Sequence, residues 1–261
     1  MTPSPRALPE ELQSALARAA GRLGPFARTI LWYPEVGSTN DVANALAERG
    51  ADEGVVVIAD HQTAGRGRLG RTWASPPGAG LYVSAVLRPS PRAAGLLTIA
   101  AGVAVAQAVS TATGLDVQLK WPNDVHVGGR KVAGILAEGA PRHVVLGMGI
   151  NVLPSAYPPE VARLATSLEA ELGRHVDRGL LLAECLAALA ERYRELNQNG
   201  ARSVVDAWRT RASSMLGRRV EWDASGRSRV GLTENIDEDG ALVVRSGSGL
   251  VRIRSGEVRW V

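Results

Sequence analysis

The sequence predicts an α+β protein in which a central mixed β-sheet is flanked by helices and followed by a small C-terminal β-barrel. Two observations support this prediction. Up to about residue 213, short apolar runs typical of strands are interspersed with longer apolar or amphipathic segments typical of helices. Beyond that point the pattern consists only of short strands and polar turns. We therefore divide the 261 residues into domains at 1–213 and 214–261.

Two helices are predicted near the start of the chain. Residues 1–27 suit one amphipathic helix broken by glycine and proline, which is too short for the three helices and wing of a winged helix-turn-helix. We therefore expect no DNA-binding domain. Residues 38–50 predict a short surface helix, with Ser38 or Thr39 as its N-cap and an apolar stripe along one face.

The sheet is predicted from apolar runs separated by breakers. Runs at 55–60 and 81–89 predict strands on either side of a loop rich in arginine and glycine. Residues 96–114 are apolar on nearly every face, which is typical of a helix buried against a sheet and ended here by Gly114. The other predicted elements are a strand at 116–121, a hairpin over 125–139, a strand at 143–152, helices at about 179–197 and 203–212, and five C-terminal strands.

Composition indicates a protein with a substantial core and no membrane segment. Hydrophobic residues make up 45% of the chain, yet no apolar run is long enough to cross a bilayer, and the N-terminus lacks the apolar block of a signal peptide. We therefore expect a cytoplasmic location. Cys185 lies in an apolar helical segment, where a buried thiol without chemistry is expected. The formal net charge of +4 supports nucleic-acid binding only weakly.

The stretch QTAGRGRLGRTW, residues 62–73, places three arginines and three glycines within seven residues. Its G-x-G-x-x-G spacing matches a dinucleotide-binding turn, but Pro76 and Pro77 follow too closely for the helix that this motif must open. A disordered basic loop is one alternative. An anion-binding loop is the other, because glycines let backbone N–H groups approach an anion, arginines bind carboxylate or phosphate oxygens, and Trp73 offers a plane to a purine.

Lysine is rare and clustered in this sequence. Only two of the 30 basic residues are lysines, Lys120 in QLKWPNDV and Lys131 in GGRKVAGIL. An ammonium is a compact point charge, whereas a guanidinium is a planar fork, so the two are not interchangeable. Either these positions require an ammonium, or their clustering is chance.

Two further stretches carry polar groups at strand ends. Asn123 and Asp124 either cap a turn or bind polar groups and a metal. The stretch GMGINV, residues 147–152, has two glycines that permit close backbone approach. Asn151 within it offers both a donor and an acceptor, as an adenine edge requires.

Together these stretches closely resemble the motifs of the biotin protein ligases, which occur in the order GSTND, QTAGRGRLGR..W, KWPNDV....RKVAGILAE and GMGINV. The resemblance covers about residues 30–213 and fits the C-terminal part more weakly. It implies a catalytic domain with a class II synthetase-like sheet and an SH3-like C-terminal barrel. It also implies a two-step reaction, in which biotin and ATP form biotinyl-5′-AMP and a carrier lysine then takes the biotinyl group.

The resemblance assigns roles to individual residues. Lys131 would bridge the biotin carboxyl group and the α-phosphate, and Arg66, Arg68 and Lys120 would share in catalysis. Asp124 would help to position Mg²⁺. The implied biotin-binding residues are Ser38, Thr39, Asn40, Gln62, Gly65, Arg66, Lys131, Gly134 and Leu136. The implied ATP-binding residues are Arg66, Arg68, Arg71, Trp73, Asn123, Lys131 and Asn151.

The implied partner is the biotin carboxyl carrier protein domain of a carboxylase, with no binding to DNA or membranes, and a homodimer is compatible with the resemblance. A lipoate ligase or octanoyltransferase of the same superfamily is an alternative that differs in the acyl group. A nucleic-acid-binding protein that uses the arginine loop and the barrel is an alternative from another class. Its binding should fall steeply with salt, whereas biotin adenylation should not.

Overall fold

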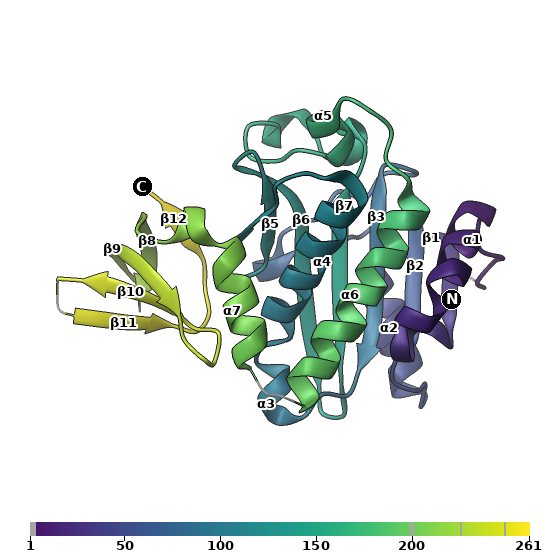
Figure 1. Ribbon diagram of the computed structural model, residues 1–261, viewed down its shortest axis with the longest axis horizontal. Coiled ribbons are helices and arrows are strands. Elements are labelled where there is room, and N and C mark those ends of the chain that lie inside the picture. The colour runs from purple at the N-terminus through teal and green to yellow at the C-terminus, as the bar shows by residue number, and fades with distance from the viewer. Residues whose placement is uncertain (1–3, 199–200, 225, 248) are drawn as a thin grey trace.

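The computed structural model describes residues 4–198, 201–224, 226–247 and 249–261. Its centre is a seven-stranded mixed sheet in the order β1-β2-β3-β7-β6-β5-β4 (Figure 1). Only the β1–β2 pair is parallel. The strands are β1 Ile30–Val36, β2 Val56–Gln62, β3 Gly80–Leu87, β4 Gln118–Lys120, β5 Asp124–Val127, β6 Arg130–Ala140 and β7 His143–Asn151. The predicted mixed sheet is therefore confirmed.

Strand β1 was not predicted, because it contains Pro34 and has no clear apolar alternation. Proline cannot donate a hydrogen bond to a neighbouring strand and is tolerated at a sheet edge. This strand lies at the edge, and its register with β2 passes over Pro34. Two helices were also missed, α3 Pro91–Ala94 and α5 Leu168–Leu172, because each is too short to show a helical period.

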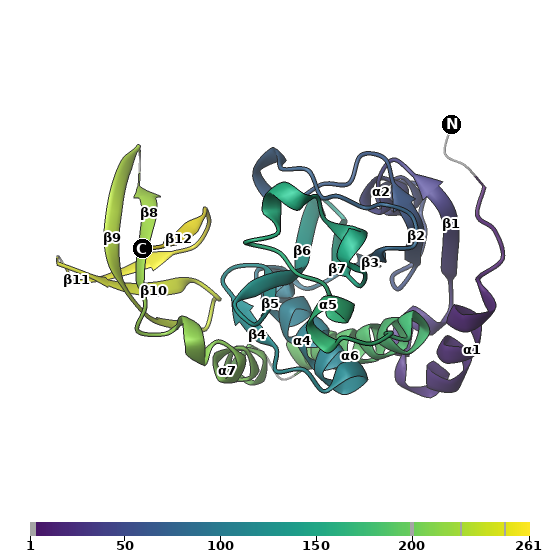
Figure 2. The same ribbon diagram turned by 90° about the horizontal axis from the view of Figure 1, so that it is seen from above.

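Helices cover both faces of this sheet. One face carries α1 Glu10–Ala19, α4 Leu97–Thr113, α6 Arg178–Gln198 and α7 Arg202–Arg211, and the other carries α2 Thr39–Glu48 (Figure 2). Strand β2 is buried on both sides, since Val56 and Ile58 belong to the core under α4 and α6, whereas Val57 and Ala59 belong to the core under α2. Burial on both faces explains why this strand reads as a continuous apolar run.

Helix α4 has the character predicted for it. It packs against α6, α7 and the sheet, so nearly all of its faces are buried, and it ends at Gly114 in the left-handed conformation with φ 79°.

Cys185 on α6 is also buried, and burial raises the pKa of its thiol to about 12. This cysteine is a structural thiol, as the sequence indicates. No described helix is long and apolar enough to span a bilayer.

The five strands predicted at the C-terminus form an antiparallel sheet in the order β11-β10-β9-β8-β12. It lies beyond α7, at the opposite end of the molecule from α1 (Figures 1 and 2). The Trp121 indole donates to the Gly240 carbonyl at 2.9 Å, which ties this sheet to the seven-stranded part of the molecule. Its strands are β8 Arg219–Ala224, β9 Arg227–Ile236, β10 Leu242–Ser246, β11 Gly249–Ile253 and β12 Val258–Trp260.

Candidate active site

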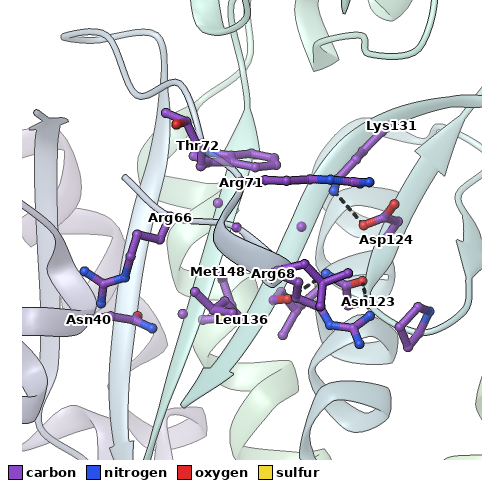
Figure 3. Close-up of a pocket in the computed structure, with 18 of the residues that line it drawn as sticks. Asn40, Arg66, Arg68, Arg71, Thr72, Asn123, Asp124, Lys131, Leu136 and Met148 are labelled. Atoms are coloured by element: carbon purple, nitrogen blue, oxygen red, sulfur yellow. Dashed lines mark hydrogen bonds and ion pairs between the residues drawn. The ribbon is translucent and has the colours of Figure 1, made fainter. Parts of the chain in front are cut away.

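A pocket opens where the Arg/Gly loop lies over strands β6 and β7 (Figure 3). The turn between β11 and β12 closes part of it. All the site residues predicted from sequence line this pocket except Gly65 and Asn151. The lining residues from that set are Ser38, Thr39, Asn40, Gln62, Arg66, Arg68, Arg71, Trp73, Lys120, Asn123, Asp124, Lys131, Gly134 and Leu136.

One end of the pocket is a network of neutral polar groups at the start of α2. Ser38 has the extended conformation of an N-cap, but its side chain makes no capping hydrogen bond. Gln62 of β2 provides the cap instead, since its Oε1 accepts from the backbone N–H of Thr39 at 2.8 Å and from the Thr39 hydroxyl at 3.0 Å. Its Nε2 donates to the Ser75 hydroxyl at 2.9 Å, which fixes the amide orientation. The network therefore holds Gln62 in one position.

Asn40 is the second node of this network. Its Oδ1 accepts from the Ser84 hydroxyl at 2.6 Å, and its Nδ2 donates to a Glu138 carboxylate oxygen at 2.5 Å. A Cβ added to Gly147 of β7 would come 2.4 Å from that Oδ1. The close approach of Asn40 to the sheet therefore requires glycine at position 147.

Gly147→Ala should keep the fold and weaken biotin binding by about tenfold, because it displaces the Asn40 amide and leaves buried polar groups unpaired. Calorimetry with biotin checks this. In an Asn40→Ala background the added methyl group has less to clash with. Gly147→Ala should therefore reduce the affinity for biotin only slightly in that background. Equal losses in both backgrounds would contradict the explanation.

The Arg/Gly loop is held by carboxylates on elements distant in sequence. Arg66 makes two hydrogen bonds to Asp41, at 2.8 and 2.7 Å, and a longer contact with Glu138 at 3.2 Å. The hydrogen bonds that Arg66 donates to Asp41 raise the pKa of the Arg66 guanidinium. Leu69 at the loop tip has φ 56°, a left-handed conformation that is unusual for a leucine.

The other two arginines of the loop reach the C-terminal sheet. Arg68 donates to Asn123 Oδ1 at 3.3 Å and to the Gly256 carbonyl at 3.4 Å, and its burial lowers the pKa of the guanidinium. Arg71 pairs with Glu257 at 2.5 Å, and that hydrogen bond lowers the pKa of the Glu257 carboxyl. The turn between β11 and β12 is therefore part of the pocket wall.

The lysine end of the pocket is built by β4, β5 and β6. Lys131 Nζ lies 2.6 Å from Asp124 Oδ1 and 5.2 Å from the centroid of the Trp73 ring (Figure 3). The Trp73 indole lies against Gly149 and Gly134, and no residue in the described part of the chain accepts a hydrogen bond from its buried Nε1. Burial lowers the pKa of Lys120. This end therefore holds two ammonium groups, and that of Lys131 lies beside the Trp73 ring.

Two predicted residues lie outside the lining. Asn151 is buried and donates from Nδ2 to the Thr166 carbonyl at 3.0 Å. Gly65 is required by the loop itself, because a Cβ there would come 2.4 Å from the Trp73 carbonyl oxygen. The ligand-binding roles predicted for both residues remain predictions.

The sequence analysis missed Glu257 of the pocket wall and four residues that hold the lining side chains in place. Asp41 and Glu138 stand within the quoted motifs GSTND and RKVAGILAE, but the reasoning assigned them no role. Ser75, Ser84 and Glu257 join the network only through contacts between distant segments. Only the motif context of the first two offered a signal.

Three features define the class of protein. They are a mixed sheet, an Arg/Gly loop that covers a pocket with two lysines, and a small antiparallel sheet joined to the larger one. Residues 32–153 match the Biotin/lipoate A/B protein ligase family, and residues 215–259 match the Biotin protein ligase C terminal domain. The chain belongs to the biotin protein ligase family.

Its similarity to known proteins extends over most of the chain. It is 40% identical to the biotin–[acetyl-CoA-carboxylase] ligase of Mycobacterium tuberculosis, with 86% of each chain covered. It is 32% identical to the bifunctional ligase/repressor BirA of Bacillus subtilis, covering 96% of this chain and 79% of that protein. The biotin protein ligase of Aquifex aeolicus in complex with biotin and ATP superposes with a TM-score of 0.80 at 30% identity, covering 90% of this chain and 99% of that one.

Proposed function

We propose that this chain is a biotin–[acetyl-CoA-carboxylase] ligase, which activates biotin with ATP and transfers the biotinyl group to a lysine of a biotin carboxyl carrier protein domain. The observation that carries the proposal is the division of one pocket into two ends. Neutral amide and hydroxyl groups gather over β2, β3 and β7, whereas Lys120 and Lys131 stand on β4 and β6. Such a pocket suits an acid whose far end is a polar ring and whose carboxylate meets a phosphate.

In the first step, a biotin carboxylate oxygen attacks the α-phosphorus of ATP, the bond to pyrophosphate breaks, and biotinyl-5′-AMP forms. Two anionic groups must come together, so the step needs cations that are already in place. Lys131 is the residue we assign to both the carboxylate and the α-phosphate, and Arg66 and Arg68 to the closing loop. Each of these cations now has a polar or carboxylate partner, which the ligand oxygens would replace.

In the second step, a neutral lysine amine of the carrier domain attacks the biotinyl carbonyl, AMP leaves, and the new amide nitrogen loses a proton. The mixed anhydride is sensitive to water, so closure of the Arg/Gly loop would protect it. Trp73 and Asn123 are proposed to hold the nucleotide.

We propose that the chain has two domains, residues 1–213 and residues 214–261.

We assign Asp124 to Mg²⁺, which would neutralise phosphate charge when bound. The described residues contain no group of three or more His, Cys, Asp or Glu side chains that could hold a metal ion. Mg²⁺ commonly binds through one or two carboxylates and the phosphates of a substrate. One protein carboxylate, that of Asp124, therefore suffices for a metal that arrives with ATP.

The neutral network favours biotin over lipoate or octanoate. Thr39, Asn40 and Gln62 present donors and acceptors that a ureido ring can pair with. Among the described residues, Asn40 and Gln62 each use only one of their two amide N–H donors, toward Glu138 and Ser75. A dithiolane ring or an alkyl chain would bury the second N–H without a partner, which costs about 1–3 kcal/mol for each buried group.

The purified chain, given ATP and Mg²⁺, should release pyrophosphate when biotin is added and should label a carrier domain with biotin. A coupled pyrophosphate assay and mass spectrometry of the carrier check the two steps separately. Lipoate and octanoate are the matched controls, and neither should support turnover. Turnover with lipoate or octanoate and not with biotin would overturn the assignment.

A further inference from the structure

One aromatic ring of the C-terminal sheet faces the lysine end of the pocket. Trp260, on the edge strand β12, is half-buried, and its ring centroid lies 5.5 Å from Lys120 Nζ. The guanidinium carbon of Arg218 lies 6.0 Å from the same centroid. Both distances are within the range over which a cation is attracted to an indole face. The ring therefore has two cations beside it, one of which lines the active-site pocket.

Lys120 differs from Lys131 and Arg71 in its partner. Lys131 pairs with Asp124, and Arg71 pairs with Glu257. Among the residues that the structure describes, no carboxylate forms an ion pair with Lys120. The ammonium is also half-buried, so solvent stabilises its charge less than at the surface. Asp124 and Glu257 favour the charged form from beyond ion-pair distance, whereas the Trp260 indole lies directly beside the ammonium.

An indole and a carboxylate affect the charge of a neighbouring lysine differently. A carboxylate neutralises a lysine and must be displaced before an anion can bind. An indole attracts the ammonium through its quadrupole and leaves the full positive charge in place. Lys120 is therefore oriented, and its ammonium is still free to donate to a phosphate oxygen.

We propose that Trp260 is a positioning residue, which holds the Lys120 ammonium toward the phosphates of ATP. The C-terminal sheet thereby contributes to nucleotide binding through a neutral ring on β12. This inference rests on the proposed function, because it assumes that ATP occupies the lysine end of the pocket. Arg218 is anchored separately by the Ser214 carbonyl at 3.1 Å and does not line that pocket.

The test compares Trp260→Met, which keeps a long apolar side chain but has no π system, with Trp260→Phe, which keeps a ring. We expect Trp260→Met to raise the KM for ATP roughly two- to fivefold, the range for a partly exposed cation–π contact. The KM for biotin should not change, and Trp260→Phe should restore most of the ATP affinity. Arg218→Gln is the matched control, since it removes the other cation beside the ring and should leave both KM values unchanged.

A double-mutant cycle with Lys120→Ala separates positioning from general damage to the sheet. If Trp260 acts through Lys120, Trp260→Met should add nothing in the Lys120→Ala background. Thermal unfolding identifies a variant that fails to fold, and Trp260→Leu then repeats the comparison. Additive effects, or equal changes in the KM for biotin and ATP, would overturn the inference while the wild-type activity still supports the proposed function. Absence of biotin-dependent pyrophosphate release by the wild type would instead count against the proposed function itself.

Discussion

Lys131→Ala is expected to lose a hundredfold or more in the rate of biotin adenylation while it keeps its fold and much of its biotin affinity. The ammonium stands between the Asp124 carboxylate and the Trp73 ring, at the cationic end of the pocket. There it can stabilise the negative charge that gathers as the carboxylate approaches the α-phosphate more than it stabilises either bound substrate. Loss of one such preorganised group commonly costs a factor of about 10² to 10³ in turnover. Single-turnover adenylation rates measure this directly.

Two further variants test the cause of that loss. Lys131→Arg should rescue only in part, because a planar fork does not fit a site shaped for a point charge. Lys131→Ala also leaves the Asp124 carboxylate without its partner, and this unpaired charge could itself repel phosphate. The double variant Lys131→Ala with Asp124→Asn removes that charge and should remain slow. Asp124→Asn alone measures how much of this slowness comes from loss of the proposed Mg²⁺ ligand. A near-normal rate in Lys131→Ala would assign the charge stabilisation to Lys120 or the arginines.

Local patterns predicted most of the catalytic sheet for physical reasons. Helix α4 and strand β2 are recognisable because each is buried on nearly all sides and so is apolar throughout. The Arg/Gly loop is recognisable because few other structures need so many arginines on so flexible a backbone. Strand β1 was missed because its stability comes from pairing with β2, which its own composition does not show.

The sequence analysis predicted which residues form the site, but it did not predict the contacts between them. Lys131 and Asp124 form an ion pair at 2.6 Å, although the sequence analysis gave them separate roles. The pairing depends on the register of β5 and β6, which shifts by one residue between Val125 and His126. Glu257 meets Arg71 from 186 residues away, a contact that no local pattern encodes. Contacts of this kind follow from the tertiary arrangement alone.

Gly149→Ala should reduce adenylation on the order of a hundredfold without unfolding the protein. The Trp73 indole lies flat against Gly149, and an added Cβ would come 2.6 Å from Nε1 and 2.7 Å from the adjacent ring carbon. The ring must retreat by roughly 1 Å to restore ordinary contact, and a displacement of that size in a positioning group can cost about 10²-fold in rate. The same ring lies 5.2 Å from Lys131, so the ammonium would lose its neighbour as well.

The matched control is Gly139→Ala, on the adjacent strand β6. A Cβ there has no heavy atom within 4 Å, so the substitution changes the composition of the same sheet without a clash. We expect its adenylation rate to match that of the wild type. Trp73→Ala provides the second comparison, because the added methyl group should cost little once the indole is gone. Equal losses in Gly149→Ala and Gly139→Ala, or a normal rate in Gly149→Ala, would show that the contact between this ring and the sheet does not govern catalysis.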